Sequence, residues 1–491
     1  MSNPIQKLAG QTAIYGLSSI VGRLLNYLLV PLYVVVFLHT SDYGVVSELY
    51  AWVAFLMVLL TFGMETAFFK FLSDKPEDKE RIFRNSMLII LSVNLVFIVL
   101  IAVFYQAIAN KMLYPDNPEY ILLLAGVVVV DAITAIPLAK LRAEERALKF
   151  AGVQLTGIGI NIALNLILML LVFQPLTQPA AVGVRFILIA NLIASFSKTI
   201  LLYKDFFQLR WKWDGQLIKR MVKYSFPLAL AGFAYIVNET VDRIMLKYLS
   251  YHSSLEGMSA SEALTFAESQ VGIYSASYKL AMIITIFLQA FRYAAEPFFF
   301  AHAKKENRND IYVKVMNYLV GVLFFSFLVV TLNIDIFKYF IPNQAYWEGL
   351  KVVPILLLAN VWSGIYINQS IWYKLSGQTK YGAYIALGGA TITITLNFIF
   401  IPIYGYMACA WATFIVYFGQ MLVSYLLGSK LYPIPYNIPK FILYSMIAVV
   451  IYFVYINIEV NPGIFPFLIR NLIILAFGGF IFWNERKQKV N

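Results

Sequence analysis

Among the ionisable side chains inside long apolar stretches of this 491-residue sequence, nine are the first candidates for chemistry. They are Arg23, Glu65, Asp131, Glu239, Asp242, Arg243, Lys279, Arg292 and Glu296. A charge in hydrocarbon costs roughly 2.5–3.5 kcal/mol on insertion scales, so such a residue normally faces a polar cavity or a partner. The cations can bind anionic oxygens, and the carboxylates can bind a proton or a small cation.

Arg23 has no acidic residue three or four positions away, and Asn26 and Tyr27 lie on its helical face instead. A guanidinium in such a place suits a cavity that receives phosphate, because its planar fork binds two oxygens at once. An ion pair with a neighbouring helix, for example with Glu65, is an equally weighted alternative.

Two further segments carry charges at helical spacing. Glu239 and Arg243 are four residues apart and can pair along one face, which leaves Asp242 to serve a proton or a cation. Asp131 is expected to pair with another helix. The candidate ion-coupling carboxylates are therefore Asp242, Glu239, Glu65 and Glu296.

The third segment contains Lys279, Arg292 and Glu296. Arg292 and Glu296 are four apart, so a local salt bridge is the favoured interpretation, whereas Lys279 has no such neighbour. At about 100° per residue, Lys279 and Arg292 lie roughly 140° apart around a helix and do not share a face. The candidates for a cationic substrate-binding cavity are Arg23, Arg243 and Lys279, with Arg292 as a further member.

The elements that must position these side chains are membrane helices. The chain is 60% hydrophobic and 13% charged, with a mean hydropathy of +0.73, whereas a soluble domain carries roughly a quarter charged residues. The apolar runs are continuous, so helices and not barrel strands satisfy the backbone in lipid. The single cysteine, Cys409, and three scattered histidines exclude a disulfide framework and indicate no metal site; no cofactor is expected.

Apolar stretches of about 20 residues between polar breaks predict an all-α membrane protein of about fourteen helices. The predicted spans are 11–38, 44–70, 84–109, 119–140, 152–174, 182–203, 220–249, 270–300, 311–333, 349–374, 380–402, 405–428, 438–458 and 464–483. The first of these is interpreted as a helix and not as a cleaved signal peptide.

The breaks alternate in charge, as the positive-inside rule requires. Every second break is rich in Lys and Arg, from residues 70–84 to the tail at 486–489, and the breaks between them are nearly bare. The longest bare break, 250–269, is acidic. Both termini are therefore predicted to be cytoplasmic, and the membrane is expected to be a bacterial inner membrane. The net charge of +12 fits anionic headgroups and is no sign of nucleic-acid binding.

The sequence also contains a parallel internal repeat. Residues 43–50 (YGVVSELY) match 271–278 (VGIYSASY), residues 65–69 match 296–300, and residues 161–166 match 393–398, in the same order. Two similar halves around a central site are common in transporters. We predict an N-terminal six-helix lobe at 1–210, a C-terminal six-helix lobe at 211–430, and two additional helices with a cytoplasmic tail at 431–491.

These motifs resemble the multidrug/oligosaccharidyl-lipid/polysaccharide exporter (MOP) superfamily, and within it the polysaccharide-transporter, or Wzx-type oligosaccharide flippase, family. The residues that carry the resemblance are Tyr43-Gly44 with Tyr50, the segment 271–275, and Leu396-Asn397 with Pro402 and Gly405. The resemblance covers essentially the whole chain. It implies two six-helix lobes around a V-shaped central cavity, alternating access, and an undecaprenyl-pyrophosphate-linked glycan as cargo.

The expected function is thus a flippase that moves a polyprenyl-pyrophosphate-linked oligosaccharide from the cytoplasmic to the outer face. The expected partners are that lipid-linked oligosaccharide and membrane lipids, with H+ or Na+ as candidate coupling ions and polysaccharide polymerase and chain-length machinery as candidate protein partners. We expect a monomer that binds no nucleic acid.

Two alternatives remain open. A cation-coupled drug or small-molecule antiporter of the same superfamily would need a cavity carboxylate, which Asp242 with Glu239 keeps in play, although the first span carries Arg23 and no acid. A glycan polymerase or glycosyltransferase would need a sizeable loop or domain with catalytic acids. The sequence has no paired-Asp metal motif, phosphate-binding glycine loop or nucleophile elbow, so we expect no enzyme.

Overall fold

The computed structural model describes residues 20–22, 24–74, 78–207, 213–303, 306–458 and 463–487, and every regular element in these ranges is helical. The main helices are α2 (Leu29–Val36), α3 (Thr40–Thr61), α4 (Met64–Asp74), α5 (Lys79–Lys111), α6 (Glu119–Ala143), α7 (Ala147–Ile167), α8 (Ala180–Leu201), α9 (Tyr203–Phe207), α10 (Gly215–Ser254), α11 (Ala260–His302), α12 (Arg308–Leu332), α13 (Ile334–Phe337), α14 (Val353–Gln369), α15 (Ile371–Leu375), α16 (Lys380–Tyr404), α17 (Tyr406–Leu431), α18 (Ile438–Ile456) and α19 (Ile464–Lys487). Short π or 3-10 turns lie at Leu168–Val172, Lys338–Phe340 and Gln344–Val352.

The span count agrees with the prediction of about fourteen helices. Within the described residues, 12 helices are long and apolar enough to cross a membrane, and a shorter apolar helix runs over Ile20–Val36. Helix α10 is 40 residues long and carries several charges in its centre, so it stands outside that set by composition alone. The prediction of an all-α, multi-pass membrane protein is confirmed.

The second predicted span is broken between α3 and α4. Phe62 and Gly63 both take left-handed backbone angles, with φ of 51° and 63°. A break inside a membrane must have its freed backbone groups satisfied from elsewhere. The Asn94 amide of α5 donates to the Leu60 carbonyl at 3.4 Å, and the backbone of α10 passes Gly63 so closely that an added Cβ would lie 3.0 Å from the Ser225 carbonyl oxygen.

The sequence prediction of a long outer loop over residues 250–269 is wrong. Helix α10 continues to Ser254 and α11 begins at Ala260, so only a short turn separates them. The start of α11 is stabilised by Ser259 and Glu262, whose side chains and backbone amides bond reciprocally. The charge-based prediction failed because Glu268, counted there as a loop acid, lies on a helix face that packs against other helices.

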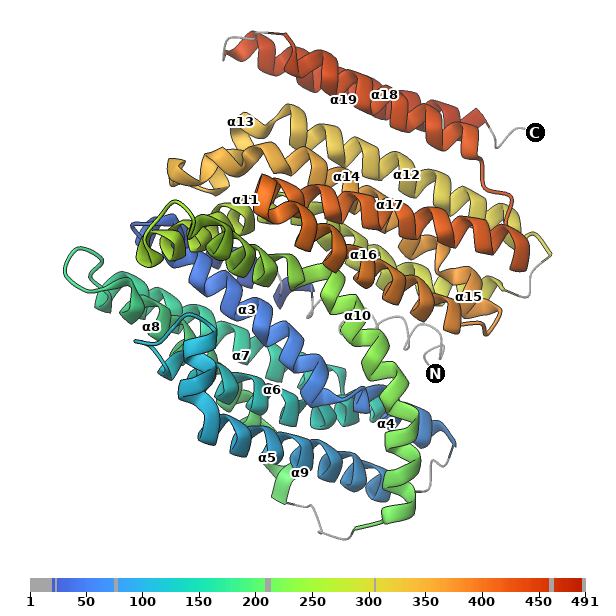
Figure 1. Ribbon diagram of the computed structural model, residues 1–491. Helices are drawn as coiled ribbons and strands as arrows, with labels where there is room; N and C mark the ends of the chain where they lie inside the picture. Colours follow the sequence, from blue (N-terminus) through green and yellow to red (C-terminus); the bar gives the residue numbers. More distant parts are fainter. Residues whose placement is uncertain are drawn as a thin grey trace. The chain divides into compact units, whose positions relative to one another are not determined.

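Contacts between residues divide the chain into two compact units, Met1–Gly272 and Ile273–Asn491. In the first unit, α3 packs against α6, α8 and α10, while α5 packs on α6 and α7 on α8 (Figure 1). In the second unit, α14 packs against α17 and α12, and α16 packs on α17. The two last helices, α18 and α19, both pack on α12. The predicted division into lobes of six and six helices with two additional helices is not tested by these two units, and it stays a prediction.

The first pair of repeated motifs meets inside the first unit. Gly44 of α3 and Gly272 of α11, aligned in the repeat, cross so closely that neither position has room for a side chain. A Cβ on Gly44 would lie 1.9 Å from the Glu268 carbonyl oxygen, and one on Gly272 would lie 2.0 Å from the Thr40 carbonyl oxygen. Thr40 and Glu268 each stand four residues before their glycine, so the two contacts are reciprocal. Two glycines thus let the equivalent helices of the repeat touch backbone to backbone.

Candidate functional site

The predicted cationic residues fall in different surroundings. Arg23 lies outside the described residues. Arg243 of α10 is buried, and its Nη1 donates to the Asp242 carboxylate at 3.1 Å and to the Glu239 main-chain oxygen at 2.9 Å. Asp242, which the sequence prediction left over for a proton or cation, therefore neutralises Arg243. This pair is a local structural unit of α10 and presents no excess positive charge.

Lys279 and Arg292 lie on α11, as predicted, and not in one site. Lys279 is half-buried, whereas Arg292 is exposed and lines a small pocket of the second unit that Lys279 does not reach. The thirteen-residue spacing that separates them around the helix explains this difference. The side chain of Glu296, the expected partner of Arg292, lies outside the described residues.

The pocket around Arg292 is the clearest candidate for a substrate contact. It is formed by α11, the end of α14 and the start of α15, and it is lined by Phe291, Arg292, Ala295, Phe299, Ile367, Asn368, Ser370, Ile371 and Lys374. No acidic side chain is among these residues. Two cations of the second unit therefore share one pocket, and the sequence had identified only one of them.

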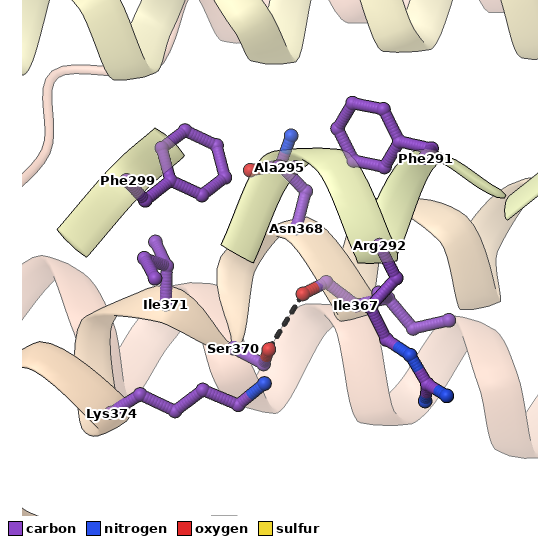
Figure 2. Close-up of a pocket in the computed structure, with 9 residues that line it drawn as sticks. All are labelled: Phe291, Arg292, Ala295, Phe299, Ile367, Asn368, Ser370, Ile371 and Lys374. Atoms are coloured by element: carbon purple, nitrogen blue, oxygen red, sulfur yellow. Dashed lines mark hydrogen bonds between the residues drawn. The ribbon is translucent and has the colours of Figure 1, made fainter. Parts of the chain in front are cut away.

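Asn368 gives this pocket its polar floor. It is 2% exposed, and neither its amide nitrogen nor its amide oxygen has a hydrogen-bond partner among the described residues. Figure 2 shows this amide between the rings of Phe299 and Phe291, with the Arg292 side chain extending away from it. The nearby Ser370 hydroxyl is already satisfied, because it donates to the Ile367 carbonyl at 2.6 Å.

A buried amide with both atoms unpaired costs free energy of about 1–3 kcal/mol, and a bound ion or water is one of the ways in which native proteins offset that cost. The amide, the Arg292 guanidinium and the Lys374 ammonium line one pocket, and together they offer positive charge and N–H groups to an anion. The arrangement is chemically suited to a phosphate-type oxyanion and unsuited to an organic cation.

The carboxylates proposed for ion coupling are engaged elsewhere or not described. Glu65 of α4 accepts from Arg142 of α6, with 2.7 Å between Oε1 and Nη2, and not from Arg23 as the alternative proposed. Asp131 pairs with Lys198 of α8 at 2.5 Å, in agreement with the expectation of a partner on another helix. Arg142 and Lys198 therefore fasten helices of the first unit to one another.

The most buried charge cluster of the described residues contains none of the predicted site residues. Lys247 of α10 is fully buried, as is Glu48 of α3; the Lys247 ammonium lies 2.9 Å from Glu48 and 3.5 Å from Glu268 of α11. Lys247 also donates to the Met112 carbonyl at 3.0 Å. We call Glu48, Lys247 and Glu268 the buried triad. It joins three helices beside the crossing of Gly44 and Gly272.

Aromatic side chains surround the triad. The Glu48 carboxylate accepts from Trp52 at 3.1 Å, from Tyr248 at 3.4 Å and from the Tyr114 hydroxyl. The Lys247 ammonium lies 3.6 Å from the centre of the Tyr114 ring. Burial, reinforced by the Glu48 and Glu268 carboxylates, raises the pKa of Tyr114 well above its ordinary value, so its phenol stays protonated and donates.

Signals for the triad were present in the sequence. Lys247 stands one turn after Arg243 on α10, and Glu48 lies inside the repeat segment 43–50. Glu268 was hidden because it was assigned to the outer loop. Glu268 stands four residues before Gly272, as Thr40 stands four residues before Gly44. Because α11 begins at Ala260, Glu268 lies within the helix and not in a loop.

Comparison with known proteins decides the family. The polysaccharide biosynthesis protein family matches residues 8–303, well over half of the chain. This chain belongs to that family. No curated protein sequence matches it.

Solved structures share the fold. A multidrug resistance MATE family transporter of the MOP superfamily, in an inward-facing conformation, superposes with a TM-score of 0.63 at 14% identity, covering 86% of this chain and 95% of the other. The lipid II flippase MurJ in an inward closed conformation gives a TM-score of 0.64 at 17% identity, covering 96% of this chain and 100% of the other. The family match confirms the expected likeness to a polysaccharide family, and the two superpositions show that the chain shares its fold with these two proteins.

Proposed function

We propose that this protein is a flippase that moves a polyprenyl-pyrophosphate-linked oligosaccharide, such as an O-antigen, capsule or exopolysaccharide unit, from the cytoplasmic to the outer face of a bacterial inner membrane. Membership of the polysaccharide biosynthesis family and a fold shared with a lipid II flippase support this proposal. The single observation that carries it is the pocket of Arg292, Lys374 and Asn368, whose described lining contains no acidic residue.

The position of the pocket fits the first step of transport. Arg292 lies toward the end of α11 and Lys374 lies in α15, both next to basic breaks that the charge pattern assigns to the cytoplasm. A lipid-linked sugar arrives at that side with its pyrophosphate at the membrane surface. The head group docks on the two cations and the Asn368 amide, the polyprenyl tail stays in lipid, and the protein alternates between inward-open and outward-open states. Arg23, Arg243 and Lys279 remain candidate cations along the path.

Complementation of a strain that lacks the chromosomal copy tests the proposal. Arg292→Ala and Lys374→Ala should lower surface glycan strongly, because each removes a charged hydrogen bond to phosphate. Arg220→Ala and Lys430→Ala, which remove exposed cations outside the pocket, should leave surface glycan unchanged. All four proteins should be present in the membrane at equal amounts.

The alternative, a cation-coupled drug antiporter with the MATE fold, predicts a different outcome. It would leave surface glycan normal in both pocket variants and would change resistance to cationic compounds. Undiminished glycan with Arg292→Ala and Lys374→Ala combined would overturn the flippase proposal. We also propose that the protein carries out no covalent chemistry, so purified protein should translocate the lipid-linked sugar chemically unaltered.

A further inference from the structure

The buried triad carries an imbalance of charge that the proposed transport step does not use. Two carboxylates, Glu48 and Glu268, face one ammonium, Lys247, so the cluster has one excess negative charge when all three are ionised. The Glu48 and Lys247 side chains are fully buried, and the Glu268 side chain is 13% exposed. An uncompensated charge in such surroundings is costly, and uptake of one proton removes the cost.

The two carboxylates differ in their surroundings. Glu48 accepts hydrogen bonds from Lys247, Tyr114, Tyr248 and Trp52. Glu268 lies farther from Lys247, at 3.5 Å. Glu268 is therefore the group that can take up and release a proton, and its partial exposure gives water a route to it.

The other charged groups around Glu268 do not cancel the excess. Asp42 of α3 adds a like charge, and His39 and Asp42 bond to each other at the helix start. Glu119 of α6 pairs with Arg185 of α8 at 2.6 Å, so that pair is neutral as a whole. The phenols of Tyr114, Tyr120 and Tyr248 add no positive charge.

The same residue also forms the helix crossing. The Glu268 carbonyl lies over Gly44, and the Thr40 carbonyl lies over Gly272. The hydroxyls of Thr40 and Ser269 are in hydrogen-bond contact beside them. The Glu268 side chain and the contact between α3 and α11 therefore belong to the same small group of residues. This group lies at the ends of the helices that the charge pattern assigns to the outer side.

We propose that the buried triad is a proton-binding site, and that closure of α3 against α11 takes up one proton on the Glu268 carboxylate. In the open form, Glu268 meets water and is ionised. On closing, a proton from the outer side binds its carboxylate oxygen, the charge of the triad goes from minus one to zero, and no other bond changes. Acid therefore favours the closed contact, by up to about tenfold in the closed-to-open ratio per pH unit for one proton.

Disulfide trapping measures the closed contact directly. In a Cys409→Ser background, Thr40→Cys and Ser269→Cys place two thiols where two hydroxyls now touch. The full-length protein in lipid nanodiscs is oxidised in a series of buffers between about pH 5 and about pH 9. This range includes the pKa values that buried carboxyl groups reach in proteins. Free thiols are then counted by the gel shift with a maleimide polymer. We expect the fraction of trapped protein, corrected for thiol reactivity, to rise as the pH falls.

Glu268→Gln is the matched control, because it keeps the shape and the thiol chemistry and removes the titrating charge. It should trap strongly at every pH, while Glu268→Asp should restore the pH dependence. An equal pH dependence in the Glu268→Gln protein, or none in the parent protein, would overturn the proposal. Either result would leave the flippase proposal intact, because no substrate is present in the assay.

Discussion

The two charged sites of this protein differ in how far their charged and polar groups are paired. The buried triad in the first unit encloses its charges with donors from several elements. The described lining of the Arg292 pocket in the second unit contains two cations and no acid, and its Asn368 amide has no hydrogen-bond partner among the described residues. The first arrangement holds helices together and can register a proton. We expect the second to gain stability when an anion binds, because the unpaired Asn368 amide would then have a partner.

The largest expected effect is a loss of stability when the triad loses its lysine. Lys247→Met leaves Glu48 and Glu268 buried without their cation and should lower the free energy of unfolding by about 3–5 kcal/mol. Thermal unfolding in detergent or nanodiscs measures this. The matched control is Lys70→Met, which removes the lysine of an exposed ion pair with Asp74 and should leave stability almost unchanged. Equal melting temperatures for the two variants would contradict a charge-dependent joint.

The next effect concerns the helix crossing beside the triad. Gly44→Ala and Gly272→Ala each place a Cβ about 2 Å from a backbone carbonyl oxygen, so α3 and α11 must move apart. We expect a loss of about 1–3 kcal/mol for each. Gly159→Ala and Gly388→Ala have open space at the same atom and should be neutral or gain up to about 1 kcal/mol. The four melting temperatures compare crossing with non-crossing glycines directly.

A third prediction separates stability from function in the pocket. Asn368→Leu removes the unpaired amide at similar volume, so the melting temperature should stay the same or rise. Surface glycan should nevertheless fall by about tenfold, because a charged hydrogen bond contributes about 1.5–3 kcal/mol. Normal glycan export by this variant would mean that the amide serves no ligand, and the contrast between pocket and triad would be lost.

The smallest expected effect concerns an ion pair at the surface, which serves as a reference for the two buried sites. Asp214 caps the start of α10, accepting from the Leu217 amide, and pairs with Arg81 of α5. The backbone hydrogen bond and the Arg81 guanidinium lower the pKa of Asp214 below its ordinary value of 3.8. Its contribution to stability is present above that ordinary pKa and is lost as the pH falls through the lowered value. Asp214→Asn should therefore melt slightly lower at neutral pH, with the difference vanishing in acid.

Much of the fold could be predicted from the sequence because membrane insertion is governed by local composition. Continuous apolar stretches and the alternating charge of the breaks indicate the spans without knowledge of contacts. The prediction failed at residues 250–269, where helix ends pack against other helices and polarity no longer marks a loop. The aligned glycines at 44 and 272 were found as a pattern, and only the structure places them against each other.

The sites depended far more on tertiary structure. The sequence indicated which residues were unusual in lipid, including Arg292, but not which partners would neutralise them. Spacing along one helix suggested a pair of Glu239 with Arg243, and the structure pairs Arg243 with Asp242. Lys374 and Asn368 complete the pocket from helices far along the chain, and Glu48 meets Lys247 across almost 200 residues. Helix periodicity predicts neighbours on one helix, whereas the charge balance of a buried site is decided by which helices pack together.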